Sequence, residues 1–191
     1  MRVVLASGSP RRKDLLTQVG IDFEIKVSNV EEIITGTHPK EVVESLSYQK
    51  AKDVFDGIES DVVVIGADTV VSVDDGILGK PKDTLDAINM IKSISGREHS
   101  VFTGVTLCIR GNGAEEVITF AEETVVCVAC MRKADIEKYV ATGEPMDKAG
   151  GYGIQGKFAA YIDGIHGDYN NVVGLPVGHI CKIFREKGII V

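Results

Sequence analysis

The chain has 191 residues, of which 44% are hydrophobic and 26% are charged, as in ordinary soluble globular proteins. This length allows one substantial core or one fold with two lobes, and we expect a single domain over residues 1–191. The formal net charge of -7 argues against a sequence-independent hold on nucleic acid, which requires a basic face. No stretch has the pattern of a signal peptide or a membrane span, so we expect a cytoplasmic protein without a membrane partner.

The first predicted turn joins a short apolar strand at residues 3–5 to a helix that ends near Gly20. Ser9 suits the N-cap and Pro10 suits the first helical position, where its missing N–H costs nothing. Three cations at 11–13 then fall in the first helical turn, where they oppose the helix dipole. A bound anion would reverse this unfavourable interaction.

The same turn carries groups that suit phosphate oxygens. It combines the hydroxyls of Ser7 and Ser9, free helix-start N–H groups, and the guanidiniums of Arg11 and Arg12. The turn therefore predicts an anion site. The alternative is an ordinary capped helix with solvated basic residues.

Two charged features follow the turn. Alternating residues at 23–27 predict a second strand. Glu31 and Glu32 come just after this strand. They are either solvated residues at the strand end or ligands of a hard divalent cation. A helix is predicted over 39–55, with Lys50 in the middle of its apolar stripe. Lys50 either extends to the surface or carries its charge into a cleft.

Asp68 interrupts an otherwise apolar strand that begins at Val62. A buried unpaired carboxylate is costly, so Asp68 needs a partner, a metal or a solvent-filled cleft, unless it is a structural residue bonded to backbone N–H groups. Asp74-Asp75-Gly76 reads as a three-residue hairpin loop that pairs Val70 with Lys80. That register places Lys80 on the face of Asp68 and keeps the carboxylate ionised.

The rest of the chain is predicted as alternating helices and strands. Asp83 caps a helix that stops at Gly96. The predicted core positions of this helix are Leu85, Ile88, Ile91 and Ile94. We further expect a hairpin of 101–109 and 116–120, a separate strand at 123–130, and helices at 135–142 and 177–187. The sequence leaves Arg97, His99 and Thr103 open between the sheet surface and the site, although lone histidines, His38 and His179 included, are more often ordinary residues.

Cys127-x-x-Cys130 invites a redox or zinc interpretation. The surrounding Val-rich segment predicts a strand, in which residues three apart point to opposite faces. No second Cys or His pair completes four ligands at zinc spacing. We therefore expect buried, unbridged cysteines, in keeping with a reducing compartment.

A glycine-rich stretch at 148–157 can bring backbone close to a ligand. It lacks the Walker spacing, and its interleaved Tyr152, Ile154 and Gln155 are unlike a flexible linker. Gln155 offers both a donor and an acceptor, as reading a base edge requires.

Taken together, these motifs resemble the Maf family of nucleoside triphosphate pyrophosphatases. The matching segments, in chain order, are Ala6-Ser7-Gly8-Ser9-Pro10-Arg11-Arg12, Gly66-Ala67-Asp68-Thr69-Val70-Val71, Leu78-Gly79-Lys80-Pro81, Ser95-Gly96-Arg97, Asp147-Lys148-Ala149-Gly150, Gly153-Ile154-Gln155-Gly156, Gly167-Asp168-Tyr169 and Val173-Gly174-Leu175-Pro176. The resemblance covers nearly the whole chain.

The resemblance implies hydrolysis of dTTP or UTP between the α and β phosphates, with a divalent metal, Mg²⁺ or Mn²⁺. Modified pyrimidine nucleotides are a further candidate substrate. It also implies an α/β fold like that of inosine triphosphate pyrophosphatases, an elongated two-lobed mixed sheet with flanking helices around a central cleft.

The resemblance also assigns roles to residues. Asp68 matches the proposed proton acceptor, and Arg11, Thr69 and Gln155 match positions associated with base specificity. The other matching cleft positions are Ser7, Arg12, Glu31, Lys50 and Lys80. We expect Asp68, Lys80 and Glu31 to be catalytic, with Glu31 and Asp68 sharing the metal. Phe158 stands where many members have glycine, and we expect it to alter the mouth of the pocket.

Two other functions fit the same motifs. One is a metal-dependent phosphatase that releases orthophosphate, and the other is a regulatory protein that binds nucleotide without turnover. The expected partner is a nucleoside triphosphate rather than a nucleic acid, and the sequence leaves a homodimer open.

Overall fold

The computed structural model describes residues 1–34, 36–74 and 76–189 of the chain. These residues form two compact units, each built from separate parts of the sequence. Unit 1 comprises Met1–Asp68, Thr103–Glu122 and Gly174–Val191. Unit 2 comprises Thr69–Phe102 and Glu123–Val173. No described helix combines the length and the hydropathy that crossing a membrane requires.

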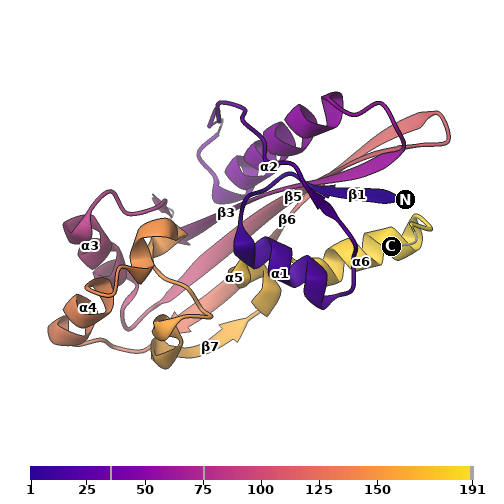
Figure 1. Cartoon of the computed structure of the whole chain (residues 1–191). Coiled ribbons are helices and arrows are strands. Elements are labelled where there is room, and N and C mark those ends of the chain that lie inside the picture. Colours follow the sequence, from indigo (N-terminus) through magenta and orange to yellow (C-terminus); the bar gives the residue numbers. More distant parts are fainter. Residues whose placement is uncertain (35, 75, 190–191) are drawn as a thin grey trace. The chain divides into compact units, whose positions relative to one another are not determined.

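Helices and strands alternate through much of the chain (Figure 1). The strands are β1 (Arg2–Leu5), β2 (Glu24–Ile25), β3 (Val62–Val73), β4 (Gly76–Leu78), β5 (Glu98–Gly111), β6 (Ala114–Val128) and β7 (Ile162–His166). The α-helices are α1 (Pro10–Gln18), α2 (Pro39–Asp56), α3 (Thr84–Ile94), α4 (Lys133–Val140), α5 (Tyr169–Val173) and α6 (Val177–Glu186). Short 3-10 helices occupy Glu144–Asp147, Ala149–Gly151 and Lys157–Tyr161.

The described strands form one mixed sheet in the order β2-β1-β3-β5-β6-β7, with β4 paired to β3. Strand β1 is parallel to both β2 and β3, whereas β3–β4 and β6–β7 are antiparallel. Asn112 and Gly113 both have positive φ, as the tight turn between β5 and β6 requires. The mixed sheet with flanking helices confirms the predicted α/β class.

The core of unit 1 lies between the strands and α2, and it includes Val4, Val54, Phe55, Val62 and Val64. Helix α2 covers one side of the unit 1 strands (Figure 1). Two glycines permit this close packing. A Cβ on Gly66 would lie 2.6 Å from the backbone nitrogen of Ala51, and one on Gly104 would lie 2.8 Å from that of Glu44. No real Cβ tolerates such contacts.

The core of unit 2 centres on Phe158, which is fully buried. Its ring lies 5.1 Å from that of Tyr139, 4.7 Å from that of Tyr152 and 5.8 Å from that of Tyr161. The expectation that Phe158 shapes the mouth of a pocket is therefore wrong, because an aromatic cluster encloses the ring. His99 is also buried, with Nε2 2.7 Å from the Tyr152 hydroxyl, and burial lowers the pKa of His99 to about 4.

Several local signals are confirmed. Pro10 and Pro39 open α1 and α2 as predicted. Asp83 caps α3, since its side chain accepts a hydrogen bond from the Asp86 N–H at 2.8 Å. The predicted amphipathic helix at the carboxyl end is α6.

Three predictions about strands are wrong. Strand β2 is only two residues long, and its Ile25 is exposed because the alternating pattern has no core to face. The segments predicted as separate strands at 116–120 and 123–130 form the single strand β6, as far as Val128. In the β3–β4 hairpin Val73 pairs with Gly76 and Val71 with Leu78, which shifts the predicted register by one residue. Asp75 of this loop lies outside the described residues.

Two predictions about burial are also wrong. Leu85 is 66% exposed, because Ala87 rather than Leu85 faces the core from the first turns of α3. The described cysteines are unbridged as expected, but only Cys108 is buried, and Cys130 is exposed just after β6 ends.

Candidate functional site

The turn after β1 is organised by Ser7, which is buried. Its Oγ accepts hydrogen bonds from the Ser9 N–H at 3.3 Å and from Arg12 Nη1 at 3.1 Å. Ser9 occupies the N-cap position as predicted, but its side chain makes no capping hydrogen bond. The hydroxyl that orders the helix start is thus that of Ser7.

Arg12 is held by acceptors from distant parts of unit 1. Its Nε donates to the Gly174 carbonyl at 2.8 Å, and its Nη1 donates to the Ala67 carbonyl at 2.9 Å. Removal from water lowers the pKa of Arg12, and the negative charges of Asp68 and Glu32 partly oppose this effect. An arginine stays charged under these conditions, so Arg12 is a fixed cation next to Asp68 and does not match the alternative of a solvated basic residue.

Asp68 forms an ion pair with Lys50 of α2. Lys50 Nζ lies 2.6 Å from Asp68 Oδ1 and 3.0 Å from Glu32 Oε1. The Lys50 and Asp68 side chains are only 16% and 15% exposed. Lys50 therefore carries its charge inward, where it serves two carboxylates at once.

The predicted pairing of Asp68 with Lys80 rested on the wrong hairpin register. The observed register pairs Val73 with Gly76 and Val71 with Leu78, and the pairing ends two residues before Lys80, so the hairpin gives no ground for an Asp68–Lys80 pair. The carboxylate takes its partner from α2. This contact follows from the packing of α2 on Gly66, which precedes Asp68 by two residues and shares its face of β3.

The remaining predicted site residues fall into two groups. In unit 1, Glu31 is exposed and Arg11 is half-buried, and Arg11 acts electrostatically on Arg12. In unit 2, Lys80 and Gln155 are exposed and Thr69 is half-buried. Unit 1 thus brings together Ser7, Arg11, Arg12, Lys50 and Asp68.

The glycine-rich stretch of unit 2 is anchored by Glu144, which sequence reasoning missed. The Glu144 carboxylate accepts hydrogen bonds from the Tyr139 hydroxyl at 3.1 Å and from the Lys157 N–H at 3.0 Å. Its backbone carbonyl accepts from Lys148 Nζ at 2.7 Å. A Cβ on Gly156 would collide with the Glu144 carboxylate. The contacts at Gly156 and Lys157 fix the backbone just after Gln155.

Glu144→Ala should lower the free energy of unfolding by about 1–3 kcal/mol, because it leaves the Tyr139 hydroxyl and the Lys157 N–H without their acceptor. Denaturant unfolding measures this loss. The control is Glu137→Ala, which removes an exposed carboxylate paired with Lys133 at 3.7 Å and should change stability by no more than about 0.5 kcal/mol. Equal effects of the two variants would contradict an anchoring role for Glu144.

Two other contributors to the site were not foreseen. Glu32 rather than Glu31 contacts Lys50, and the acidic doublet was the only sequence signal for it. The Gly174 carbonyl that binds Arg12 gives no sequence signal, because any residue carries a backbone carbonyl.

Comparison with known proteins gives a consistent result. The family model described as Maf-like protein matches residues 2–187. A protein of Agathobacter rectalis named dTTP/UTP pyrophosphatase is 47% identical, over 98% of this chain and 98% of its own length. One of Thermosipho africanus with the same name is also 47% identical, over 100% and 95%. Among solved structures, a HAM1 protein from Coxiella burnetii matches with a TM-score of 0.46 and 16% identity, covering 97% of this chain and 99% of that one.

The motifs that carry the family pattern include those that build the unit 1 cluster. The turn between β1 and α1 supplies Ser7 and Arg12, and strand β3 supplies Asp68. With a match over nearly the full length and relatives at this level of identity, the chain belongs to the family of Maf-like proteins.

Proposed function

We propose that this protein hydrolyses dTTP and UTP to the nucleoside monophosphate and pyrophosphate. The observation that carries the proposal is the pairing of Asp68 with Lys50 beside the fixed guanidinium of Arg12, in a chain whose relatives are named for this activity. A phosphoanhydride hydrolase needs a group that handles water and cations that stabilise phosphate charge. This cluster contains both.

Asp68 is the proposed base. Its carboxylate orients a water molecule and accepts a proton as the water oxygen attacks the α phosphorus. The bond from the α phosphorus to the bridging oxygen breaks, and pyrophosphate leaves with the bonding electrons. Lys50 holds the carboxylate at 2.6 Å and fixes its direction before substrate arrives.

Arg12 and Lys50 are the proposed stabilisers of phosphate charge in unit 1. Arg12 is already fixed by three oxygen acceptors, so little reorganisation is needed when charge develops on the phosphate oxygens. The Ser7 hydroxyl and the Arg11 guanidinium come from the same turn as Arg12, and both are proposed to bind phosphate oxygens. Lys80 is proposed as a further cation for the leaving group.

A divalent cation, Mg²⁺ or Mn²⁺, is part of the proposal. Carboxylate oxygens are the donors that these hard metals prefer. Glu31 and Asp68 are the proposed ligands. Among the described residues neither belongs to a preformed group of three ligand side chains, so phosphate oxygens would complete the coordination. When bound, the metal supplies charge neutralisation at the phosphates.

Gln155, with Thr69 and Arg11, is proposed to select the base. Gln155→Ala should change the ratio of kcat/KM for UTP to that for CTP. The variant lacks the amide donor and acceptor of Gln155, and their loss affects hydrogen bonds to the uracil edge and to the cytosine edge unequally. Steady-state kinetics with both nucleotides measure this ratio. Lys157→Ala serves as control, since it changes an exposed neighbour but keeps the amide. An unchanged ratio in Gln155→Ala would remove Gln155 from base selection.

The reaction itself is tested by product analysis. The purified protein with Mg²⁺ or Mn²⁺ should release pyrophosphate from dTTP and UTP and leave the monophosphate. Release of orthophosphate would support the metal-dependent phosphatase instead. Tight nucleotide binding with no turnover under any metal condition would support the regulatory protein.

We also propose that the protein works in the cytoplasm on free nucleotides. The described cysteines are unbridged, in keeping with a reducing compartment, and the net charge of -7 disfavours a nucleic-acid partner. A homodimer remains a proposal that sedimentation analysis would test.

A further inference from the structure

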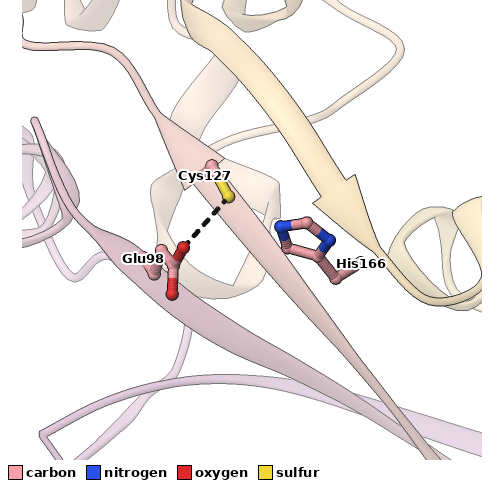
Figure 2. Close-up of side chains that lie close together, drawn as sticks. All are labelled: Glu98, Cys127 and His166. Carbon is pink, nitrogen blue, oxygen red and sulfur yellow. Dashed lines mark hydrogen bonds between the residues drawn. The ribbon is translucent and has the colours of Figure 1, made fainter.

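Three side chains of types that bind transition metals meet on unit 2. Glu98 comes from the start of β5, Cys127 from β6 and His166 from the end of β7 (Figure 2). Their ligand atoms all lie within 4.8 Å of one another. The Cys127 Sγ donates a hydrogen bond to Glu98 Oε1 at 3.5 Å, as Figure 2 shows.

The strand pairing brings His166 to Cys127. In the β6–β7 ladder Val125 pairs with His166, and Cys127 pairs with Gly164. Val125 and Cys127 lie on the same face of β6, because they are two residues apart. His166 is therefore the diagonal neighbour of Cys127 on that face, within reach of a long side chain.

The other neighbouring strand brings Glu98 to the same place. The Val128 N–H donates to the Arg97 carbonyl at 3.0 Å, which places the next residue of β5, Glu98, beside Cys127. On the β7 side the partner of Cys127 is Gly164, and a Cβ built on Gly164 would meet nothing within 4 Å. The space next to the thiol is thus open.

We propose that Glu98, Cys127 and His166 bind a zinc ion. One thiolate, one imidazole and one carboxylate are all ligands that zinc accepts, whereas Mg²⁺ and Ca²⁺ select oxygen donors. Three protein ligands leave the fourth tetrahedral position to water, in agreement with the exposure of Glu98 and His166. This site uses none of the residues assigned to nucleotide hydrolysis.

Binding requires a small contraction and the loss of one proton. Ligands at about 2.0–2.3 Å from zinc stand roughly 3.3–3.8 Å from one another in a tetrahedron. The present separations of up to 4.8 Å close to these values through side-chain rotation of the exposed Glu98 and His166. The Cys127 S–H bond breaks, its proton passes to solvent, and the sulfur binds the metal, with no oxidation or reduction.

Cys130, which a Cys-x-x-Cys zinc site would use as its second ligand, is exposed beyond the end of β6. The partners that the fold supplies instead are 29 residues before Cys127 on β5 and 39 residues after it on β7. A bound ion would connect the two strands that flank β6, β5 and β7, to β6.

Cobalt(II) is the probe, because a cobalt–thiolate bond gives a charge-transfer absorption that a carboxylate-only site lacks. The full chain, stripped of metal with a chelator, should bind one Co²⁺ with this absorption, and Zn²⁺ should displace it. A large excess of Mg²⁺ should not. Cys127→Ser should abolish the absorption, and His166→Asn should weaken binding by at least about tenfold.

Cys130→Ser is the matched control, since it removes a nearby exposed thiol outside the cluster, and it should keep the full absorption. Absence of the thiolate absorption in the wild-type chain, or its survival in Cys127→Ser, would overturn the proposal. Zinc should also raise the Tm of the wild-type chain but not that of Cys127→Ser. An equal rise in both would show that zinc acts elsewhere and would likewise overturn it.

Discussion

Replacing Asp68 by asparagine should lower kcat for dTTP hydrolysis by about 10²–10⁴-fold, because the amide cannot accept the proton of the attacking water. The fold should survive, since the Lys50 ammonium keeps Glu32 as a partner at 3.0 Å. Initial rates of pyrophosphate release over a range of substrate concentrations separate this loss of kcat from a change in KM. Circular dichroism and the Tm report the state of the fold.

Asp56→Asn is the matched control for this experiment. Asp56 also pairs with a lysine of α2, Lys52, but the pair is exposed and lies outside the cluster. This variant should keep its kcat within about twofold and its stability within about 0.5 kcal/mol. If Asp68→Asn retained a near-normal kcat, Asp68 would not be the base, and the proposed chemistry would need another proton acceptor.

Gly104→Ala should lower the free energy of unfolding by about 3 kcal/mol, the upper part of the range for an overpacked core. The new methyl group would meet the Val43 carbonyl and the Glu44 backbone nitrogen, the latter at 2.8 Å. Backbone atoms of a helix cannot rotate away as a side chain can. Helix α2 must therefore shift, and Tm should fall by about 6–12 °C. Because Lys50 belongs to α2, kcat should fall as well.

The control is Gly178→Ala, which adds a methyl group at an exposed position of α6 with nothing within 4 Å. Alanine is the better helix former, so this variant should gain about 0.5–1 kcal/mol. Thermal and denaturant unfolding of both variants give the comparison. If Gly104→Ala were as stable as the parent chain, the close approach of α2 to β5 at Gly104 would be incorrect.

The sequence predicted those features that are encoded within a few residues. Pro10 and Pro39 mark helix starts through their fixed φ, and the Asp83 side chain caps the helix that follows it. The continuous apolar run after Val62 identified a central strand. The need of Asp68 for a partner could be predicted because burial of a lone carboxylate is unfavourable, and the structure supplies that partner in Lys50.

The partner of Asp68 could not be predicted in the same way. The identity of this partner depends on which element packs on that face of β3. The close packing of α2 requires Gly66, but the local sequence does not distinguish Gly66 from a turn glycine. The hairpin offered an alternative partner, but a register error of one residue moves a side chain to the opposite face. Lys80 was therefore predicted as the partner of Asp68, whereas the structure shows that Lys50 makes this contact.

Burial was the other source of error. Phe158 was expected at the mouth of a pocket because many family members have glycine at this position, yet its ring is buried against Tyr139, Tyr152 and Tyr161. Glu144 lies 11 residues before Gln155 and belongs to no sequence pattern, although it binds the Lys157 N–H just after that residue. Both results depend on contacts between segments rather than on local sequence.

The interleaved composition of the two units has a consequence for synthesis. Unit 1 takes its last segment from residues after Gly174, and unit 2 begins at Thr69 but ends only at Val173. While the nascent chain emerges from the ribosome, unit 1 remains without α6 and without the Gly174 carbonyl that binds Arg12 until all of unit 2 has been made. Neither unit can be completed by a contiguous fragment, so we expect both to fold late, with slow kinetics set by contacts between distant residues.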